Sequence, residues 1–222
     1  MKVTRLIVPL VVLLSSAVLA QADYITGIAW DVPQTTAILT PTLGNQPGPG
    51  AMEIATFTAS AINFSATYNY NVGFTGAPGT YTLAGFLNSN GAASNITYLN
   101  YASPVLFINN TLWEFTGSAL FTNGQTYSVT HDDGVNLYVN GIAVLLDGDP
   151  TSPVLNSFTY TGPTGVFNFD FLYTQCCLGT ADFITDLVPD LTSAPEPSSA
   201  SLFLAAAVLA GGLYQARRRF AR

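Results

Sequence analysis

Short apolar or alternating runs, separated by Gly, Asn, Pro and Ser, fill the middle of the chain. Alternation with a period of two is typical of a strand that buries one face, and turn residues between such runs favour short strands over helices. No run between residues 23 and 190 has a convincing helical period. The predicted strands are Glu53–Thr58, Ile62–Tyr68, Thr80–Phe86, Ile96–Leu99, Leu112–Phe121, Thr126–His131, Val135–Val139, Ile142–Leu146, Ser157–Thr161, Val166–Tyr173 and Asp182–Leu187. A spacing near ten residues predicts an all-β antiparallel sandwich of about ten strands.

Two of these runs carry more specific expectations. In Val166–Tyr173 all the aromatic residues fall on one face, which predicts a core strand rather than an exposed platform for sugars. In the hairpin, Asn140-Gly141 supplies the two positive φ angles of a type I′ turn. The two-residue turn predicts that Val139 lies opposite Ile142 and Leu137 opposite Val144.

The two ends of the chain have a different pattern. Residues 1–22 have the basic start, apolar stretch and small-residue cleavage site (Ala20-Gln21-Ala22) of a signal peptide, which predicts cleavage by signal peptidase and export. The predicted body spans residues 23–190, and residues 191–222 are set apart by a Pro-containing linker. Ser198–Tyr214 is an uncharged apolar helix candidate, and four arginines follow it.

Basic and acidic residues occupy different parts of the chain, with the same boundaries between the ends and the body. All six Lys and Arg residues lie at the ends, and all 13 acids lie between Asp23 and Glu196, so that stretch has a formal charge of −13 although the whole chain has −7. A stretch without a basic residue cannot neutralise phosphates, which excludes nucleic acid as a partner. Its carboxylates must be solvated, hydrogen-bonded or balanced by metal ions. Solubility in an extracellular setting explains the same bias.

The linker, the apolar helix and the arginines stand in the order Pro195-Glu196-Pro197, apolar run, basic cluster. This order resembles the PEP-CTERM sorting tail. The resemblance implies recognition by an exosortase-type membrane protease, so the chain would contact the inner membrane only through its C-terminal helix before processing. A plain C-terminal anchor is the alternative. Either reading places the body outside the inner membrane.

The run from Gly117 to Asp147, with its Asp-Asp-Gly followed by a hairpin, resembles the core of the protective-antigen-type β-sandwich module of toxins, glycosidases and flocculins. The aromatic strand, small loop and apolar strand of residues 165–187 resemble its closing strands. The resemblance covers about residues 111–187. It implies an adhesin-like module in which Asp132 and Asp133, joined by a cis peptide bond, bind calcium and through it a sugar.

Other readings of these residues stay open. Asp132 and Asp133 are also ordinary turn residues before the Gly134 bend. Asn136, Cys176 and Cys177 are candidates for the ligand-contacting loops that the resemblance implies, whereas Asp147 and Asp149 are near in sequence without a place in the pattern. The only cysteines, Cys176 and Cys177, fall in the loop before the last strand. An oxidising compartment favours a disulfide between them, and free thiols or links between chains are the alternatives.

Catalysis has little support in the sequence. His131 is the only histidine and precedes Asp132, but a triad depends on spatial geometry rather than adjacency, and the G-x-S-x-G motif is absent. The expectation is therefore a protein without enzymatic activity. The first functional reading is a calcium-dependent carbohydrate-binding or adhesin module of the cell surface or exopolysaccharide matrix. The second is a structural matrix protein without a specific ligand.

Overall fold

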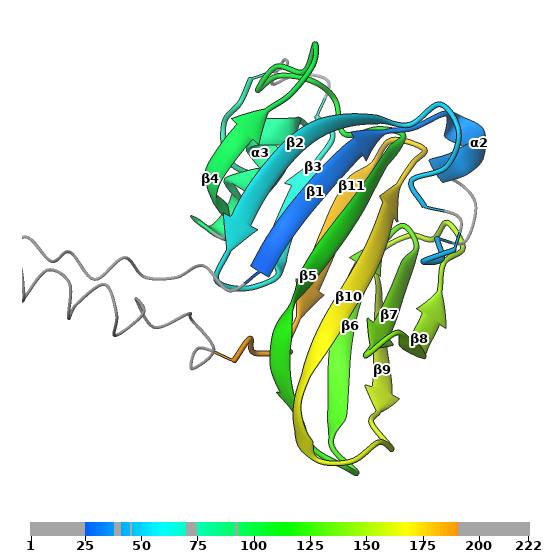
Figure 1. Cartoon of the computed structure of the whole chain (residues 1–222). Coiled ribbons are helices and arrows are strands. Elements are labelled where there is room, and N and C mark those ends of the chain that lie inside the picture. Colours follow the sequence, from blue (N-terminus) through cyan, green and yellow to red (C-terminus); the bar gives the residue numbers. More distant parts are fainter. Residues whose placement is uncertain (1–24, 38–40, 45, 70–74, 92, 191–222) are drawn as a thin grey trace, which may run out of the picture.

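The computed structural model describes residues 25–37, 41–44, 46–69, 75–91 and 93–190. These residues form two packed β-sheets (Figure 1), one of seven strands in the order β4-β2-β1-β5-β10-β7-β8 and one of four in the order β3-β11-β6-β9. The strands are β1 Ile25–Asp31, β2 Met52–Ala59, β3 Asn63–Thr67, β4 Ala93–Tyr98, β5 Thr111–Phe121, β6 Thr126–Asp132, β7 Val135–Val139, β8 Ile142–Asp147, β9 Val154–Thr159, β10 Gly165–Gln175 and β11 Thr180–Thr185. The prediction of an all-β sandwich is confirmed.

The core lies between the two sheets and is rich in aromatic rings. Phe169, Phe171 and Tyr173 of β10 are buried, and Phe167 packs half-buried at its beginning, which confirms the predicted core face of this strand. From the opposite sheet, the ring of Phe183 on β11 lies 5.3 Å from the ring of Phe171. A buried Phe contributes about 1.5–3 kcal/mol relative to an exposed one, so this row holds the layers together.

Strand β1 was missed by the pattern analysis, although it lies between β2 and β5 in the larger sheet. Its inward positions hold small residues, such as Gly27 and Ala29, which give a weak alternating signal. A Cβ atom at Gly27 would stand 2.0 Å from the ring of Phe57, so the ring of the neighbouring strand occupies the space above this glycine. The strand is therefore defined by its partners more than by its own sequence.

The prediction of a strand at Thr80–Phe86 is wrong. Residues Leu83–Leu87 form a short helix, α3, whose N-cap is Thr82. The Thr82 hydroxyl accepts a hydrogen bond from the Gly85 amide (3.1 Å), and all five residues of the helix are buried. The run is apolar on every side, so its periodicity does not separate a buried helix from a buried strand. Two other short helical segments are α2 (Gln34–Ala37) and the 3₁₀ segment η1 (Ser89–Gly91).

The hairpin of β7 and β8 agrees with the prediction at its turn, but the pairing of its strands differs from the prediction farther from the turn. Asn140 and Gly141 have positive φ angles of 49° and 76°, and Val139 lies opposite Ile142 as predicted. Leu137 lies opposite Leu145 instead of Val144, because a bulge falls between Leu137 and Tyr138. The extra residue shifts the register of the rest of β8, and the sequence does not signal it.

Several predicted features lie outside the described residues. They are the signal peptide, the Pro195-Glu196-Pro197 motif and the apolar Ser198–Tyr214 segment. Within the part of the chain that the structure describes, no helix has the length and apolar character needed to cross a membrane.

Candidate functional site

Asp132 and Asp133 lie where β6 ends and the chain turns into β7. The peptide bond between them is cis, and both residues are buried, with exposed fractions of 6% and 4%. They line a pocket of about 400 Å³ together with two loops, Pro150–Pro153 and Cys176–Thr180. The fold therefore brings the acidic pair and the cysteine pair, 43 positions apart, to one pocket.

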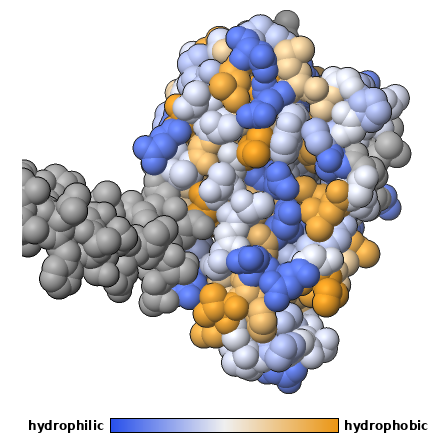
Figure 2. Space-filling view, in the orientation of Figure 1, coloured by the Kyte–Doolittle hydropathy of each residue, from blue (hydrophilic) through white to orange (hydrophobic). Residues whose placement is uncertain are grey.

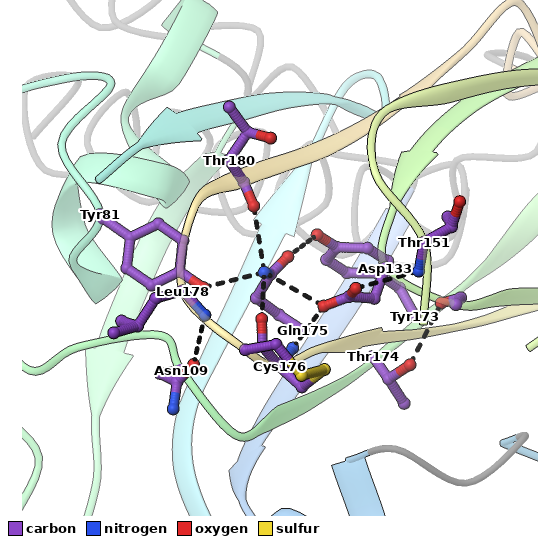
Figure 3. Close-up of a disulfide and its surroundings, with 12 residues drawn as sticks. Tyr81, Asn109, Asp133, Thr151, Tyr173, Thr174, Gln175, Cys176, Leu178 and Thr180 are labelled. Carbon is purple, nitrogen blue, oxygen red and sulfur yellow. Dashed lines mark hydrogen bonds between the residues drawn. A yellow bond between two sulfur atoms is a disulfide. The ribbon is translucent and has the colours of Figure 1, made fainter. Parts of the chain in front are cut away.

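The carboxylate of Asp133 is bonded to both loops. Its Oδ2 atom accepts a hydrogen bond from the Cys176 amide (2.6 Å), and its Oδ1 atom accepts one from the Thr151 amide (3.1 Å) (Figure 3). A longer contact of 3.4 Å joins Oδ2 to the side-chain amide of Gln175. Hydrogen bonds to a carboxylate are stronger than neutral ones, so Asp133 fixes the position of each loop relative to the strands.

Asp132 is held by two hydroxyl groups. The Thr180 hydroxyl donates to its Oδ2 atom, and the Tyr173 hydroxyl donates to its main-chain carbonyl. Among the described residues, none donates a hydrogen bond to Oδ1 of Asp132. The acidic pair thus keeps one carboxylate oxygen without a protein donor in this part of the chain.

Burial raises the pKa of both carboxyl groups. For Asp133 the pKa rises to about 6, because loss of solvation and the nearby charge of Asp132 outweigh the Cys176 amide, which lowers it. Burial also raises the pKa of Asp132, against the hydrogen bond from Thr180. Residues 25–190 contain no Lys or Arg that could offset these charges. A bound cation would therefore stabilise both ionised forms.

Gln175, which the sequence analysis did not single out, connects the pocket to the core. Its side chain is fully buried, and its Oε1 atom lies 2.6 Å from the Tyr173 hydroxyl, whose single proton is shared between this oxygen and the Asp132 carbonyl. Besides Asp133, three acceptors surround its amide nitrogen in Figure 3: the Tyr81 hydroxyl (2.8 Å), the Cys176 carbonyl (3.0 Å) and the Thr180 carbonyl (3.1 Å). Its position directly before Cys176 was the only local signal, and Tyr81 had none.

His131 lies next to the acidic pair and contacts the main chain of Asp133. Its ring is fully buried, and Nδ1 lies 2.5 Å from the carbonyl of Asp133. A carbonyl only accepts, so Nδ1 carries a proton, and in the neutral ring Nε2 accepts from the Asn156 amide (3.1 Å). Oδ2 of Asp147 lies 3.4 Å from the same Nε2 atom and accepts another hydrogen bond from the Asn156 amide. His131 therefore holds the main-chain carbonyl of Asp133.

Asn136 does not join the pocket. It is fully buried on β7, where its side-chain amide donates to the carbonyl of Pro41 and its Oδ1 atom accepts from the Asp147 amide (2.9 Å). These contacts connect the hairpin to the Pro41 loop. Asn136 is thus hydrogen-bonded to Pro41 and Asp147 and does not line the pocket of Asp132 and Asp133.

Cys176 and Cys177 are joined by a disulfide in the loop between β10 and β11. Cys176 is buried beside Asp133, whereas Cys177 and Leu178 are exposed at the rim, and both of these have positive φ angles. The Leu178 amide donates to Oδ1 of Asn109 (3.0 Å). The loop thus presents a disulfide and an apolar side chain to solvent beside the acidic pair.

We expect freshly exported protein to contain no free thiol and to run as a monomer on a non-reducing gel. The physical reason is that each cysteine has its only covalent partner next to it in an oxidising compartment. A thiol count under denaturing conditions measures this, and Cys177→Ser is the control, because it must restore one free thiol. A covalent dimer, or two thiols per chain, would contradict the expectation.

The pocket fits a hard cation in the kind of donor it offers. Calcium takes six to eight oxygen ligands, and the pocket supplies two carboxylates together with loop carbonyls and hydroxyls. Within the described residues, no three His, Cys, Asp or Glu side chains are arranged so that they could hold a metal ion together. Beyond Asp132 and Asp133, further ligands would therefore be neutral oxygens of the loops, of water or of a bound molecule.

The body is thus a two-layer β-sandwich with an acidic pocket at the end of its central strands. No protein-family model matches the sequence, and no curated protein matches it either. The PA14 domain of the MpAFP antifreeze protein is similar in structure at 22% identity and a TM-score of 0.49, over 78% of this chain and 85% of that one.

Two further solved structures are similar. A PA14 sugar-binding domain from an RTX adhesin has 18% identity and a TM-score of 0.46, over 79% of this chain and 94% of that one. An anti-sigma factor domain-containing protein has 12% identity and a TM-score of 0.44, over 80% and 50%. Likeness at this level assigns no residue role and no ligand to the protein.

Proposed function

We propose that the protein is an exported, calcium-dependent carbohydrate-binding module of the adhesin type. The observation that carries the proposal is the burial of Asp132 and Asp133 in one pocket, in a body without a single Lys or Arg. Two buried carboxylates without a basic partner favour a bound cation. A volume of about 400 Å³ is within the range of small-ligand sites.

In this proposal, bound calcium supplies positive charge and open coordination positions for neighbouring hydroxyls of a sugar. The protein's own residues hold the arrangement. The Cys176 and Thr151 amides orient the Asp133 carboxylate, and the Thr180 hydroxyl orients that of Asp132. The exposed Cys177 and Leu178 at the rim offer apolar contact to a sugar face. The proposal includes no catalytic step.

A structural matrix protein without a specific ligand is the second candidate. It is favoured by the hydrogen bonds that Asp133 already accepts from two main-chain amides, which satisfy much of its bonding capacity without a metal. In that case the acidic pair only connects the loops to the strands.

Glycan binding distinguishes the two candidates. We expect the purified body, residues 23–194, to bind members of a glycan panel in calcium and to lose at least tenfold in affinity in chelator. Asp133→Asn should cause the same loss because it removes a charged ligand, whereas Asp186→Asn, which changes the charge equally on the smaller sheet's side, should not. Binding that is equal with and without calcium, or absent from the whole panel, would favour the structural candidate.

Export and sorting complete the proposal. The signal peptide and the PEP-type tail are proposed to direct the protein to the cell surface or extracellular matrix, with an exosortase-type protease acting at the tail. In a host that has this protease, the exported protein is expected to lack its C-terminal helix. Intact-mass measurement checks this, and a mass that still includes Arg222 would reduce the tail to a simple anchor.

A further inference from the structure

A second pocket lies away from the acidic pair, on the outer face of the seven-stranded sheet. It has a volume of about 620 Å³ and crosses β1, β5, β10 and the β7–β8 turn. This face is turned toward the viewer in Figure 2, where hydrophilic side chains lie among scattered apolar ones. The lining includes hydroxyl and amide side chains, among them Thr26, Thr116, Ser118 and Asn168.

Asp170 lies in this pocket, and Glu114 is its neighbour. On the paired strands β10 and β5, Asp170 stands opposite Thr116 and Leu172 opposite Glu114, which makes the two acids diagonal neighbours on the outer face. Burial and the charge of Glu114 raise the pKa of Asp170 to about 7. Neither acid has a Lys or Arg anywhere in residues 25–190 to pair with.

Glu114 also lines a smaller cavity of about 70 Å³, together with Trp30, Gln46 and other residues. Leu43 lines both cavities, so the two are neighbours on this face. Buried oxygens without a hydrogen-bond partner among the described residues occur in each: Oδ1 of Asp170 in the larger cavity and Oε1 of Gln46 in the smaller. The Gln46 oxygen only accepts, and the Asp170 oxygens only accept when the carboxyl group is ionised, so a ligand that satisfies both must donate.

We infer that this outer groove is a second binding site, and that its ligand is an amine-bearing sugar. An ammonium group has three donors and no acceptor, and its positive charge complements the Asp170–Glu114 pair. The hydroxyl and amide side chains of the larger cavity suit the ring hydroxyls of a sugar, and its volume accommodates more than one sugar unit. Trp30 adds an aromatic surface beside Glu114.

This inference stands apart from the calcium proposal, because no residue lines both the outer groove and the pocket of Asp132 and Asp133. The experiment is therefore carried out in excess chelator. Calorimetric titration of the purified full-length chain compares glucosamine tetramer, N-acetylglucosamine tetramer and cellotetraose at about pH 7, close to the pKa of Asp170, so that the acid pair keeps negative charge.

We expect the glucosamine tetramer to bind at least tenfold more tightly than the other two probes. Asp170→Asn and Glu114→Gln should each weaken its binding about tenfold, whereas Asp186→Asn on the opposite side of the molecule should leave it unchanged. Each site variant replaces one carboxylate oxygen with an NH₂ group and so keeps the shape of the side chain. Circular dichroism verifies that both variants fold.

Three results would overturn the inference. Equal binding of all three tetramers would show that charge is not recognised, and absence of binding would remove the site. An equal loss in Asp186→Asn and Asp170→Asn would mean that the amine polymer is attracted by the overall negative charge rather than by the groove.

Discussion

Calcium is expected to raise the melting temperature of the body, residues 23–194, well above its value in chelator. A ligand that binds only the folded state stabilises it by RT ln(1 + [Ca²⁺]/Kd), about 2.7 kcal/mol at a hundredfold excess over Kd. For a domain of this size, that corresponds to roughly 5–10 °C. Magnesium should act less, because it requires a tighter octahedron than two carboxylates and loop oxygens provide. Differential scanning fluorimetry measures both effects.

Single substitutions test whether the calcium-dependent rise in melting temperature arises at the acidic pair. Asp133→Asn should remove most of the calcium gain, because it deletes a charge that lies in the pocket. Asp147→Asn is the matched variant on the same β6–β8 segment, and it should have a smaller effect because Asp147 does not line the pocket. If the wild type melts at the same temperature in calcium and in chelator, the calcium-dependent reading is excluded and the structural reading replaces it.

Phe183→Ala is expected to cost about 3–5 kcal/mol of unfolding free energy, the usual loss for a fully buried aromatic residue. Its ring centroid lies 4.9 Å from those of Phe115 and Tyr173, and it stacks on Tyr173 with an interplanar angle of 5°. Phe183 also lies opposite His131, the residue before the acidic pair. The substitution should therefore lower the calcium gain as well as the stability.

Urea unfolding followed by tryptophan fluorescence measures the loss. Val166→Ala on β10 is the control: Val166 is 49% exposed, and exposed substitutions usually change stability by about 0.5 kcal/mol or less. Similar losses in the two variants would show that the aromatic row does not carry the stability of the core.

Alternation and turn residues predicted most of the strands, because they act over a few neighbouring residues. The Asn140-Gly141 turn was predictable for the same reason. The bulge after Leu137 was not, because it depends on how β8 meets its neighbours rather than on local sequence. The helix at Leu83–Leu87 was missed because burial on all sides removes the periodic signal.

The residues of the candidate site, too, were only partly predictable from local sequence. Asp132, Asp133 and the cysteine pair were predicted because each is an adjacent pair with its own chemistry. Their meeting in one pocket depends on strand pairing between β6 and β11, which brings Asp132 opposite Asp182 and thus close to the Thr180 end of the loop. Tyr81 reaches Gln175 across 94 positions, a distance over which a single sequence carries no pattern.

Both ends of the described chain meet the middle of β5. Ile25 pairs with Gly117, and the Asp190 amide donates to the Ser118 carbonyl (2.7 Å). The strand then runs about 20 Å further to Thr111, at roughly 3.3 Å per residue, where it pairs with Gln175 beside the acidic pocket. A body held at Ile25 or at Asp190 would therefore carry that pocket at the other end of β5 from the point of attachment. The outer groove, which includes Gly117 and Ser118, would lie beside the point of attachment.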